Sequence, residues 1–503
     1  MSIRTPIFLL LAALVLLASS CSRSQAAPSS PSTLTPAPVQ GNTPGPATGS
    51  AAGLMNQATE QPGSVASATR LAPLPAASSP ATSPVEAPIA TATRSSQPSP
   101  VSDLIYLATD RLMRWDPLTR HAISLARNVT GFVASTDGQV IILLRPQKIT
   151  ANGAQKFNLD ALRLDDQQII TLIDNAMQPG IILASPDGNL VAYTQNLAEG
   201  VTIYLLPVEA GNRPQKLGVC QPAPAAECAS LAWSPDSRDL LWSDAQGLWQ
   251  VSTRAGELGS KAQLVHPSKV RIQDPKGQNV EMEARFADLQ FAPSERFLRL
   301  KVTPLDSQVG WQAVFDRRSG LLAQAEDTFV TREVEAQTIW QSNGNLVVAH
   351  ASDPGRQIPP YIHTWYVMPT NPELLVSGEQ VDLYSDDFPF SAAQSKAIPA
   401  HCLHWLAETQ PNHLVFGVQL DQSDDPPVLF DLNLVTGGLT KVLNLPADTT
   451  QVLWSPDGVH ALVLGGRNQI SLLSLKSGEL IDLQTSLGPS AQQFHWLPPV
   501  LRR

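Results

Sequence analysis

The chain has 503 residues, with 34 lysines and arginines against 44 aspartates and glutamates, and a net charge of −10. Hydrophobic residues make up 43% of it, enough for a large folded core. The acidic balance argues against nucleic acid as a partner and against adhesion of the whole body to anionic lipid headgroups, because both require a basic surface.

The first twenty residues have the pattern of a secretory signal: a basic Arg4, an apolar run over 7–18, and small residues before Cys21. The run is shorter than an ordinary membrane span. Residues 17–21, Leu-Ala-Ser-Ser-Cys, resemble the bacterial lipobox, with Ala18 in the place of its usual leucine. The resemblance implies cleavage before Cys21 and lipidation of its side chain, which anchors a protein outside the cytoplasm, on the periplasmic side or at the cell surface. The alternative is an ordinary signal peptide with a chance cysteine at the cut.

Residues 21–100 are rich in Ala, Pro, Ser and Thr, contain no aromatic residue and carry few charges. Such a segment cannot bury enough apolar surface to offset the entropy of ordering it, so we expect a disordered tether. Its prolines favour extended conformers, with a reach of up to about 200 Å. We interpret it as a spacer between the lipid anchor and a folded body; a merely tolerated low-complexity arm is the alternative.

Residues 101–503 contain the tryptophans and regularly spaced turn signals. The segment 453–458, Leu-Trp-Ser-Pro-Asp-Gly, recurs in altered copies roughly every fifty residues, and a fixed period of this kind indicates a repeat architecture. We call its last four residues, Ser-Pro-Asp-Gly, the frame. The residues that precede the copies of the frame are Ala134, Ala184, Trp233, Phe291, Trp340, Trp405, Trp454 and Trp496.

Each unit has the same internal order, as in the copy that begins at Gln451: apolar runs to Trp454, over 460–464, over 469–475 and over 479–483, separated by tight turns. This predicts four antiparallel strands. Serine, proline and glycine suit successive positions of the frame turn, so most of its aspartates are predicted turn formers and not catalytic groups. A four-stranded sheet of this size cannot cover its own faces, and radial stacking of such sheets predicts an all-β propeller.

The two ends of the body complement each other. Residues 103–108, 111–115 and 121–125 provide three strands without an inner one, and 493–497 provides an inner strand with almost nothing after it. Together they form a composite blade that closes a ring of eight blades. Seven blades is the alternative, if the weak copy at Trp405 is not a blade of its own.

The frame followed by an apolar strand resembles the WD40-like repeat of TolB-type propellers, which also occurs in the propellers of prolyl-oligopeptidase and dipeptidyl-peptidase relatives. The resemblance covers most of the body and implies a fold, not a function. Those peptidases carry a Gly-x-Ser-x-Gly nucleophile elbow, which this sequence lacks, so we expect no peptidase. The turns 316–320 and 434–437 are faintly similar to those of eight-bladed quinone-dependent dehydrogenases, but the tryptophan docking signature of that family is missing. We predict no cofactor.

Three cysteines follow Cys21. Cys220 and Cys228 bracket a Pro/Ala-rich loop and are a candidate disulfide outside the cytoplasm, whereas Cys402 is expected to be a small buried hydrophobe. His401 and His404 lie near Cys402, but residues three apart on a strand point to opposite faces, so we predict no metal site.

A candidate binding loop combines aromatic and acidic residues, a pairing that is favoured at interfaces: Tyr384, Asp386, Asp387, Phe388 and Phe390. The alternative is an ordinary loop. The preferred hypothesis is a membrane-anchored, non-enzymatic binding or assembly module for a protein or an envelope glycan. The alternatives are a propeller hydrolase or lyase that acts on glycans, and a structural spacer. No spacing singles out a catalytic pair, so no catalytic residue is assigned, and the oligomeric state stays open.

Overall fold

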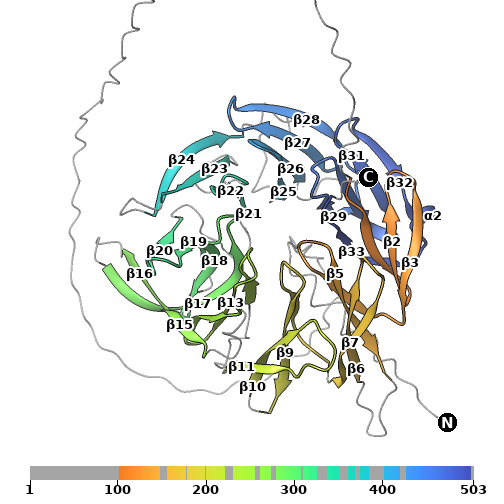
Figure 1. Cartoon of the computed structure of the whole chain (residues 1–503). Helices are drawn as coiled ribbons and strands as arrows, with labels where there is room; N and C mark the ends of the chain where they lie inside the picture. The colour runs from red at the N-terminus through yellow and green to blue at the C-terminus, as the bar shows by residue number, and fades with distance from the viewer. Residues whose placement is uncertain are drawn as a thin grey trace, which may run out of the picture. The chain divides into compact units, whose positions relative to one another are not determined.

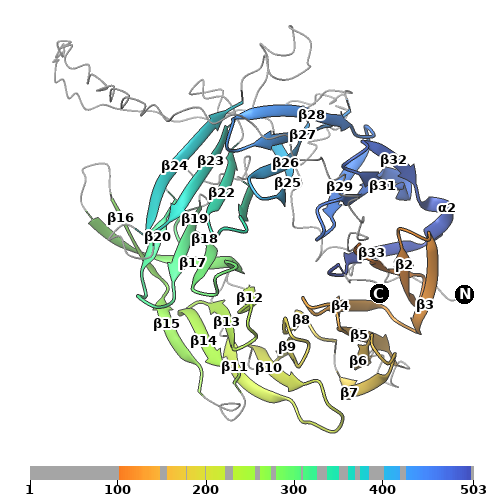
Figure 2. The same ribbon diagram turned by 45° about the horizontal axis from the view of Figure 1, so that its top comes forward.

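The computed structural model describes residues 101–147, 156–176, 178–198, 200–220, 230–254, 261–273, 279–307, 310–325, 337–350, 361–368, 374–383, 402–419 and 426–499. Their strands form eight antiparallel sheets arranged around one axis, an eight-bladed β-propeller (Figures 1 and 2). Both the all-β class and the count of eight predicted from the sequence are confirmed. The predicted signal segment 1–20 and tether 21–100 lie outside the described residues.

Blades are numbered here in the order of their inner strands. Blade 1 contains β4 (Gly131–Ala134), β5 (Val140–Pro146), β6 (Phe157–Arg163) and β7 (Ile169–Ala176). Blade 2 contains β8 (Ile182–Ala184), β9 (Leu190–Leu197), β10 (Gly200–Pro207) and β11 (Gln215–Cys220). Blade 3 contains β12 (Ser230–Trp233), β13 (Asp239–Asp244), β14 (Gly247–Ser252) and β15 (Gln263–Pro267). Blade 4 contains β16 (Lys269–Gln273), β17 (Asn279–Phe291), β18 (Phe297–Pro304), β19 (Trp311–Asp316) and β20 (Leu322–Gln324).

Blade 5 contains β21 (Gln337–Trp340), β22 (Leu346–His350), β23 (Tyr361–Val367) and β24 (Leu375–Asp382). Blade 6 contains β25 (Cys402–Gln410), β26 (His413–Gln419), β27 (Val428–Asn433) and β28 (Gly438–Asn444). Blade 7 contains β29 (Thr449–Trp454), β30 (His460–Gly465), β31 (Ile470–Ser474) and β32 (Glu479–Asp482), with the short 3₁₀ turn η2 (Gly466–Asn468) before β31. The short helix α2 (Gln484–Leu487) follows β32.

Blade 8 closes the ring with strands from both ends of the body: β33 (Ala491–Trp496) on the inside, followed outward by β1 (Leu104–Ala108), β2 (Arg111–Asp116) and β3 (His121–Arg127). Leu104 pairs with Trp496 and Ala108 with Ala491. This confirms the predicted composite blade. The seven-blade alternative is excluded because β25–β28, which contain Trp405, form a sheet of their own.

Hydrogen bonds within the frame explain its sequence. The buried Ser455 donates from its hydroxyl to Asp457 Oδ1 at 2.5 Å and accepts the backbone N–H of His460 at 2.9 Å. Asp457 Oδ1 also accepts the N–H of Val459 at 2.9 Å. Gly458 has a φ of 66°, which glycine adopts without steric penalty. The same serine–aspartate contact occurs in blades 1, 2 and 3, at Ser135, Ser185 and Ser234. These aspartates are turn formers, as predicted.

Tryptophans at the end of the inner strands tie neighbouring blades together. The indole Nε1 of Trp454 donates to the carbonyl oxygen of Trp405 in the preceding blade at 2.8 Å, and that of Trp496 donates to Leu453 at 2.9 Å. Two further contacts of this kind join Trp233 to Leu183 and Trp340 to Gln290. A large apolar ring with one N–H donor suits this position, because it fills the wedge between blades and satisfies an inner-strand carbonyl.

The substitution Trp454→Phe tests this tie between blades. Phenylalanine keeps most of the ring packing but leaves the Trp405 carbonyl without its donor, which costs about 1–2 kcal/mol of unfolding free energy. Trp365→Phe is the matched control, since the buried Trp365 indole N–H meets no acceptor among the described residues. Denaturant titration should show a loss about 1 kcal/mol larger for Trp454→Phe than for Trp365→Phe. Equal losses would contradict the role given to the indole hydrogen bond.

Two units depart from the regular spacing. The long interval before Phe291 contains an additional hairpin: β16 pairs with the first part of β17, and the hairpin projects beyond the perimeter of the ring (Figure 2). In the sixth copy, Trp405 is not the end of its strand. Strand β25 continues to Gln410 through an irregularity between His404 and Ala407, where Trp405 has a φ of 58°.

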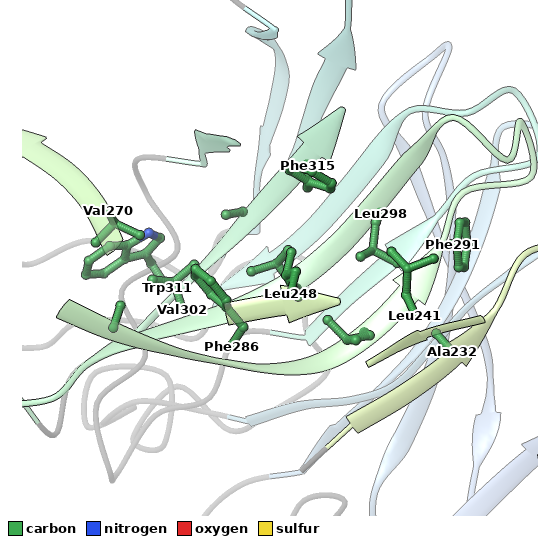
Figure 3. Packing of buried hydrophobic residues seen from close by; sticks show 14 residues of the cluster. Ala232, Leu241, Leu248, Val270, Phe286, Phe291, Leu298, Val302, Trp311 and Phe315 are labelled. Atoms are coloured by element: carbon green, nitrogen blue, oxygen red, sulfur yellow. The ribbon is translucent and has the colours of Figure 1, made fainter. Parts of the chain in front are cut away.

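Apolar side chains fill the interfaces between blades. Between blades 3 and 4, Leu241 and Leu248 pack in one cluster with Phe286, Phe291 and Leu298 (Figure 3). The strands alternate so that neighbouring residues face opposite blades, and each blade is therefore covered on both sides.

Candidate functional site

The antiparallel order of each blade sorts its connections between two ends of the ring. Turns from the first to the second strand and from the third to the fourth lie at one end, which we call the frame end because it carries the frame turns, such as 455–458. Turns from the second to the third strand, and the links from one blade to the next, lie at the opposite end, which we call the loop end. The two ends therefore receive different parts of the sequence.

The N-terminal chain enters the body at the frame end. The backbone N–H of Ser102 donates to Asp457 Oδ2 at 2.9 Å, and the N–H of Leu497 donates to the carbonyl of Asp103 at 2.8 Å. Arg114 forms an ion pair with Asp103. Burial alone would raise the pKa of Asp457, but hydrogen bonds from Ser455, Ser102 and Val459 outweigh it and lower the pKa. Asp457 is thus an ionised acceptor that fixes the start of the body, at Ser102, to blade 7.

Most of the long connections depart from the loop end. They link β5 to β6, β11 to β12, β20 to β21, β22 to β23, β24 to β25 and β26 to β27. The longest runs from Asp382, where β24 ends, to Cys402, where β25 begins. The frame end instead has short turns in most blades; the longer links there join β10 to β11, β14 to β15 and β23 to β24. Loops held by a rigid scaffold are the usual position of binding residues, so the loop end is the candidate binding surface.

Most residues of the sequence-predicted sites lie outside the described residues: Cys21, Cys228, His401 and the candidate binding loop Tyr384, Asp386, Asp387, Phe388 and Phe390. The strands on either side of that loop, β24 and β25, respectively end and begin at the loop end. Cys220 is buried at the end of β11 and is disulfide-bonded. Its pairing with Cys228 stays a prediction.

Of the residues considered for a metal, His404 is the one whose side chain lies in the described part of the chain. Cys402 begins β25, and His404 is buried in the same strand with its ring 5.4 Å from that of Trp405. Burial lowers the pKa of His404 to about 4, so this imidazole is neutral at physiological pH. Within the described ranges, no group of three histidine, cysteine or acidic side chains is arranged to hold a metal ion. No helix in that part of the chain is long and apolar enough to cross a membrane.

His413 has a geometry that a search for acid–base groups would select, but both of its ring nitrogens are engaged. Nδ1 lies 3.1 Å from Asp431 Oδ1, and Nε2 lies 3.3 Å from the amide nitrogen of Asn433. The Asn433 oxygen accepts two backbone N–H groups, so its NH₂ faces the histidine and donates to Nε2. Nδ1–H then donates to Asp431. In this network neither nitrogen is placed to take a proton from a substrate.

Arg299 is a buried cation that sequence reasoning missed. It lies on β18 between blades 4 and 5, and its guanidinium donates to both the carbonyl and the hydroxyl oxygen of Thr338 on β21. Burial lowers its pKa to about 10, an effect that the nearby Asp288 partly offsets. The sequence does contain a signal for this residue, because Arg299 interrupts an apolar strand that enters a blade interface. Its contacts join the second strand of blade 4 to the inner strand of blade 5 and are structural.

Asp316 forms a two-oxygen ion pair with Arg296 at the end of β19. It accepts Arg296 through both oxygens, at 2.8 and 2.6 Å, and also accepts the Ser319 hydroxyl and the Arg318 N–H. The Arg296 hydrogen bonds lower its pKa to about 2, although burial opposes the shift. Its side chain is 2% exposed, so the contact is little screened by water.

Asp316→Asn should lower the unfolding free energy by about 2–3 kcal/mol at pH 7, because the folded state holds this carboxylate ionised roughly two pKa units below its unfolded value. A lowered carboxylate pKa gives stability above pH 4, which is lost as the pH falls toward 2. The difference from the wild type should therefore shrink between pH 4 and 2 in denaturant titrations. A difference that stays constant over this range would show that the loss is not electrostatic.

No family model and no curated protein matches the sequence. Among solved structures, the chain is similar to a dipeptidyl peptidase 4 of Porphyromonas gingivalis, with a TM-score of 0.50 and 11% identity over 76% of this chain. The chain spans 57% of the length of that peptidase. It is also similar to a dihydro-heme d1 dehydrogenase, with a TM-score of 0.46, 13% identity and coverage of 75% of this chain and 72% of the other. The similarity to a prolyl endopeptidase has a TM-score of 0.43 and 15% identity, and it covers 71% of this chain and 49% of the other. At these identities the likeness shows the propeller fold alone.

Proposed function

We propose that this chain is a lipid-anchored, extracytoplasmic propeller of the TolB-like type that acts as a non-enzymatic binding or assembly module for a protein or an envelope glycan. Cys21 carries the lipid, and residues 22–100 form the tether. The partner contacts the loop end. The observation that carries the proposal is the separation of the two ends: the N-terminal chain enters at the frame end, and most long connections depart from the loop end.

The frame aspartates and His413 are engaged in hydrogen bonds within the scaffold, which supports a binding role over a catalytic one. The frame aspartates of blades 1, 2, 3 and 7 accept hydrogen bonds inside their own turns, and His413 is held between Asp431 and Asn433. These groups stabilise the scaffold and are not free to act on a substrate. The TolB-like resemblance of the frame agrees with a propeller that presents a surface, since it implies a fold without a fixed chemistry.

A capture experiment with defined orientation tests the proposal. Residues 98–503, within which the ring is complete, are immobilised either through the N-terminus or through a bio-orthogonal side chain at Leu305, an exposed loop-end residue after β18. Envelope extracts and purified envelope glycans are passed over both surfaces. Attachment through the N-terminus should give saturable retention of one partner, and attachment through Leu305 should reduce it strongly.

Two results would contradict the proposal. Equal retention on both surfaces would remove the loop end from the binding site. Conversion of a glycan to products, with no stable complex, would favour the hydrolase or lyase alternative.

Anchoring is tested separately: the full chain should fractionate with membranes, and Cys21→Ser should release it to the soluble extracytoplasmic fraction.

A further inference from the structure

Exposed aliphatic side chains gather at the frame end. Ten large hydrophobic residues are exposed in the described part of the chain, and five of them lie in frame-end turns. They occupy five consecutive blades, from blade 4 to blade 8: Leu321, Met368, Val435, Val459 and Leu118. Val435 is 74% exposed and Leu118 is 60% exposed. Single exposed aliphatic residues are ordinary, but one on each of five adjacent blades at the same end forms a common surface.

Hydrogen bonds fix the geometry of these turns, and the exposed aliphatic side chains are not required for it. In blade 6, the Asn433 side-chain oxygen accepts the N–H groups of Val435 and Thr436, and the Asn433 carbonyl accepts that of Gly437. In blade 8, Asp116 accepts the N–H of Leu118. The backbone of each turn is thus satisfied within the turn, and the aliphatic tip makes no contribution to its geometry.

Cationic and acidic side chains are placed differently in these turns. Exposed cations stand beside the tips: Arg318 in the blade 4 turn, Lys476 in the third-to-fourth-strand turn of blade 7, and Arg120 in the blade 8 turn. Two carboxylates of the same region are engaged internally, because Asp316 accepts Arg296 and Asp457 accepts Ser455, whereas Glu479 is exposed at the start of β32. Aliphatic tips next to cations fit the boundary between lipid headgroups and acyl chains.

We propose that the frame end of blades 4–8 docks on the interface of a lipid bilayer. The inference rests on the proposed anchoring at Cys21, since the N-terminal chain that leads to that residue leaves the body at this same end, beside Asp457 and Val459. A lipid at Cys21 would confine the body to within reach of the tether from the membrane, and the frame end is the end from which the tether departs. Docking turns the loop end away from the lipid.

The acidic net charge of the chain restricts which blades can approach anionic headgroups, but it does not prevent docking. At the same end, blades 1 and 2 carry exposed acidic residues in their outer turns: Asp165, Asp166 and Glu209. These residues are repelled by anionic headgroups, so the body docks tilted, with blades 4–8 toward the bilayer.

Vesicle co-sedimentation of residues 98–503, which carry no lipid, tests the surface independently of Cys21. Vesicles of phosphatidylcholine with one quarter phosphatidylglycerol are compared with pure phosphatidylcholine. Wild type should bind both, more tightly with phosphatidylglycerol at low salt because of the cations. The combined substitution of Leu118, Leu321, Val435 and Val459 by serine should lower the partition coefficient at least tenfold.

The matched control replaces four equally apolar exposed residues that lie outside the frame-end turns, namely Ile169, Leu264, Val280 and Leu305, by serine. It should change partitioning less than twofold, with both variants melting close to wild type.

The opposite change, Leu118→Trp with Val435→Trp, should tighten binding several-fold, because tryptophan favours the membrane interface. Equal loss in the two serine variants, or no vesicle binding by wild type, would overturn the proposal. Concentration-dependent self-association that only the frame-end variant abolishes, without vesicle binding, would assign the surface to a second copy instead. In either case the full chain would still fractionate with membranes through Cys21, so the anchoring proposal would stand.

Discussion

A chain that ends at Gly488 should fail to form a cooperatively folded body. The truncation removes β33, the inner strand of blade 8, and leaves β1 paired with β2 alone. Leu104, Ile105 and Leu107, which are fully buried in the closed ring, would then lose cover, and the Leu453 carbonyl would lose the Trp496 indole. Uncovering three such side chains alone costs about 5–9 kcal/mol, comparable with the whole stability of many domains. Thermal unfolding followed by circular dichroism should show no sharp transition.

A chain that ends at Pro499 is the control, because it keeps β33 and the N–H of Leu497 that donates to Asp103. It should melt like the full chain. A peptide covering residues 489–503, added to the shorter chain, should restore part of the transition if the strand closes the ring by pairing alone. A cooperative, unchanged transition in the chain that ends at Gly488 would show that blade 8 does not close the ring.

Acid should destabilise the body through His404. The folded-state pKa of about 4 lies below the ordinary value of 6.5, because burial disfavours the charged imidazole. Stability from the neutral form is therefore complete above pH 6.5 and is lost as the pH falls toward 4. The difference corresponds to about 3 kcal/mol at pH 4. Denaturant titrations from pH 7.5 to 4 should show this slope in the wild type.

His404→Leu should flatten that slope, since leucine keeps an apolar side chain in β25 and cannot take a proton. The control is His121→Leu, which replaces an exposed histidine on β3 and should leave the slope unchanged. An unchanged pH dependence in His404→Leu would mean that the acid sensitivity arises elsewhere in the ring.

The repeat carried most of the information about the fold. A serine that binds the aspartate of its own turn, and a tryptophan that reaches the preceding blade, recur because each blade meets the same local problem. The composite blade was also predictable, since three strands at one end and one at the other are complementary. What the period could not show was the hairpin of β16 and β17, because extra paired strands and a long loop add the same number of residues.

The position of Trp405 shows a second limit of sequence reasoning. A tryptophan at the expected spacing resembles the end of an inner strand, yet β25 continues to Gln410 around a local irregularity. A β-bulge changes the register without a strong compositional signal. The contact from the Trp454 indole is nevertheless made to the Trp405 carbonyl, so the link between blades survives the shift.

The candidate site was predictable only in outline. The sequence indicated one candidate binding loop, but it did not separate the two ends of the ring. That separation follows from strand direction, which places the Ser102–Asp457 contact at one end and the connection from Asp382 to Cys402 at the other. Buried polar contacts such as those of Arg299 were missed because they depend on which residues face each other across a blade interface.

The frame end and the loop end are proposed to have different roles, and photo-crosslinking in membranes compares them directly. A photoreactive side chain is placed either at Val435 of the frame end or at Leu305 of the loop end in the full chain, and the adducts are identified by mass spectrometry. We expect lipid adducts from Val435 and adducts with one protein or glycan from Leu305. Lipid adducts from Leu305, with the partner attached at Val435, would contradict this expectation.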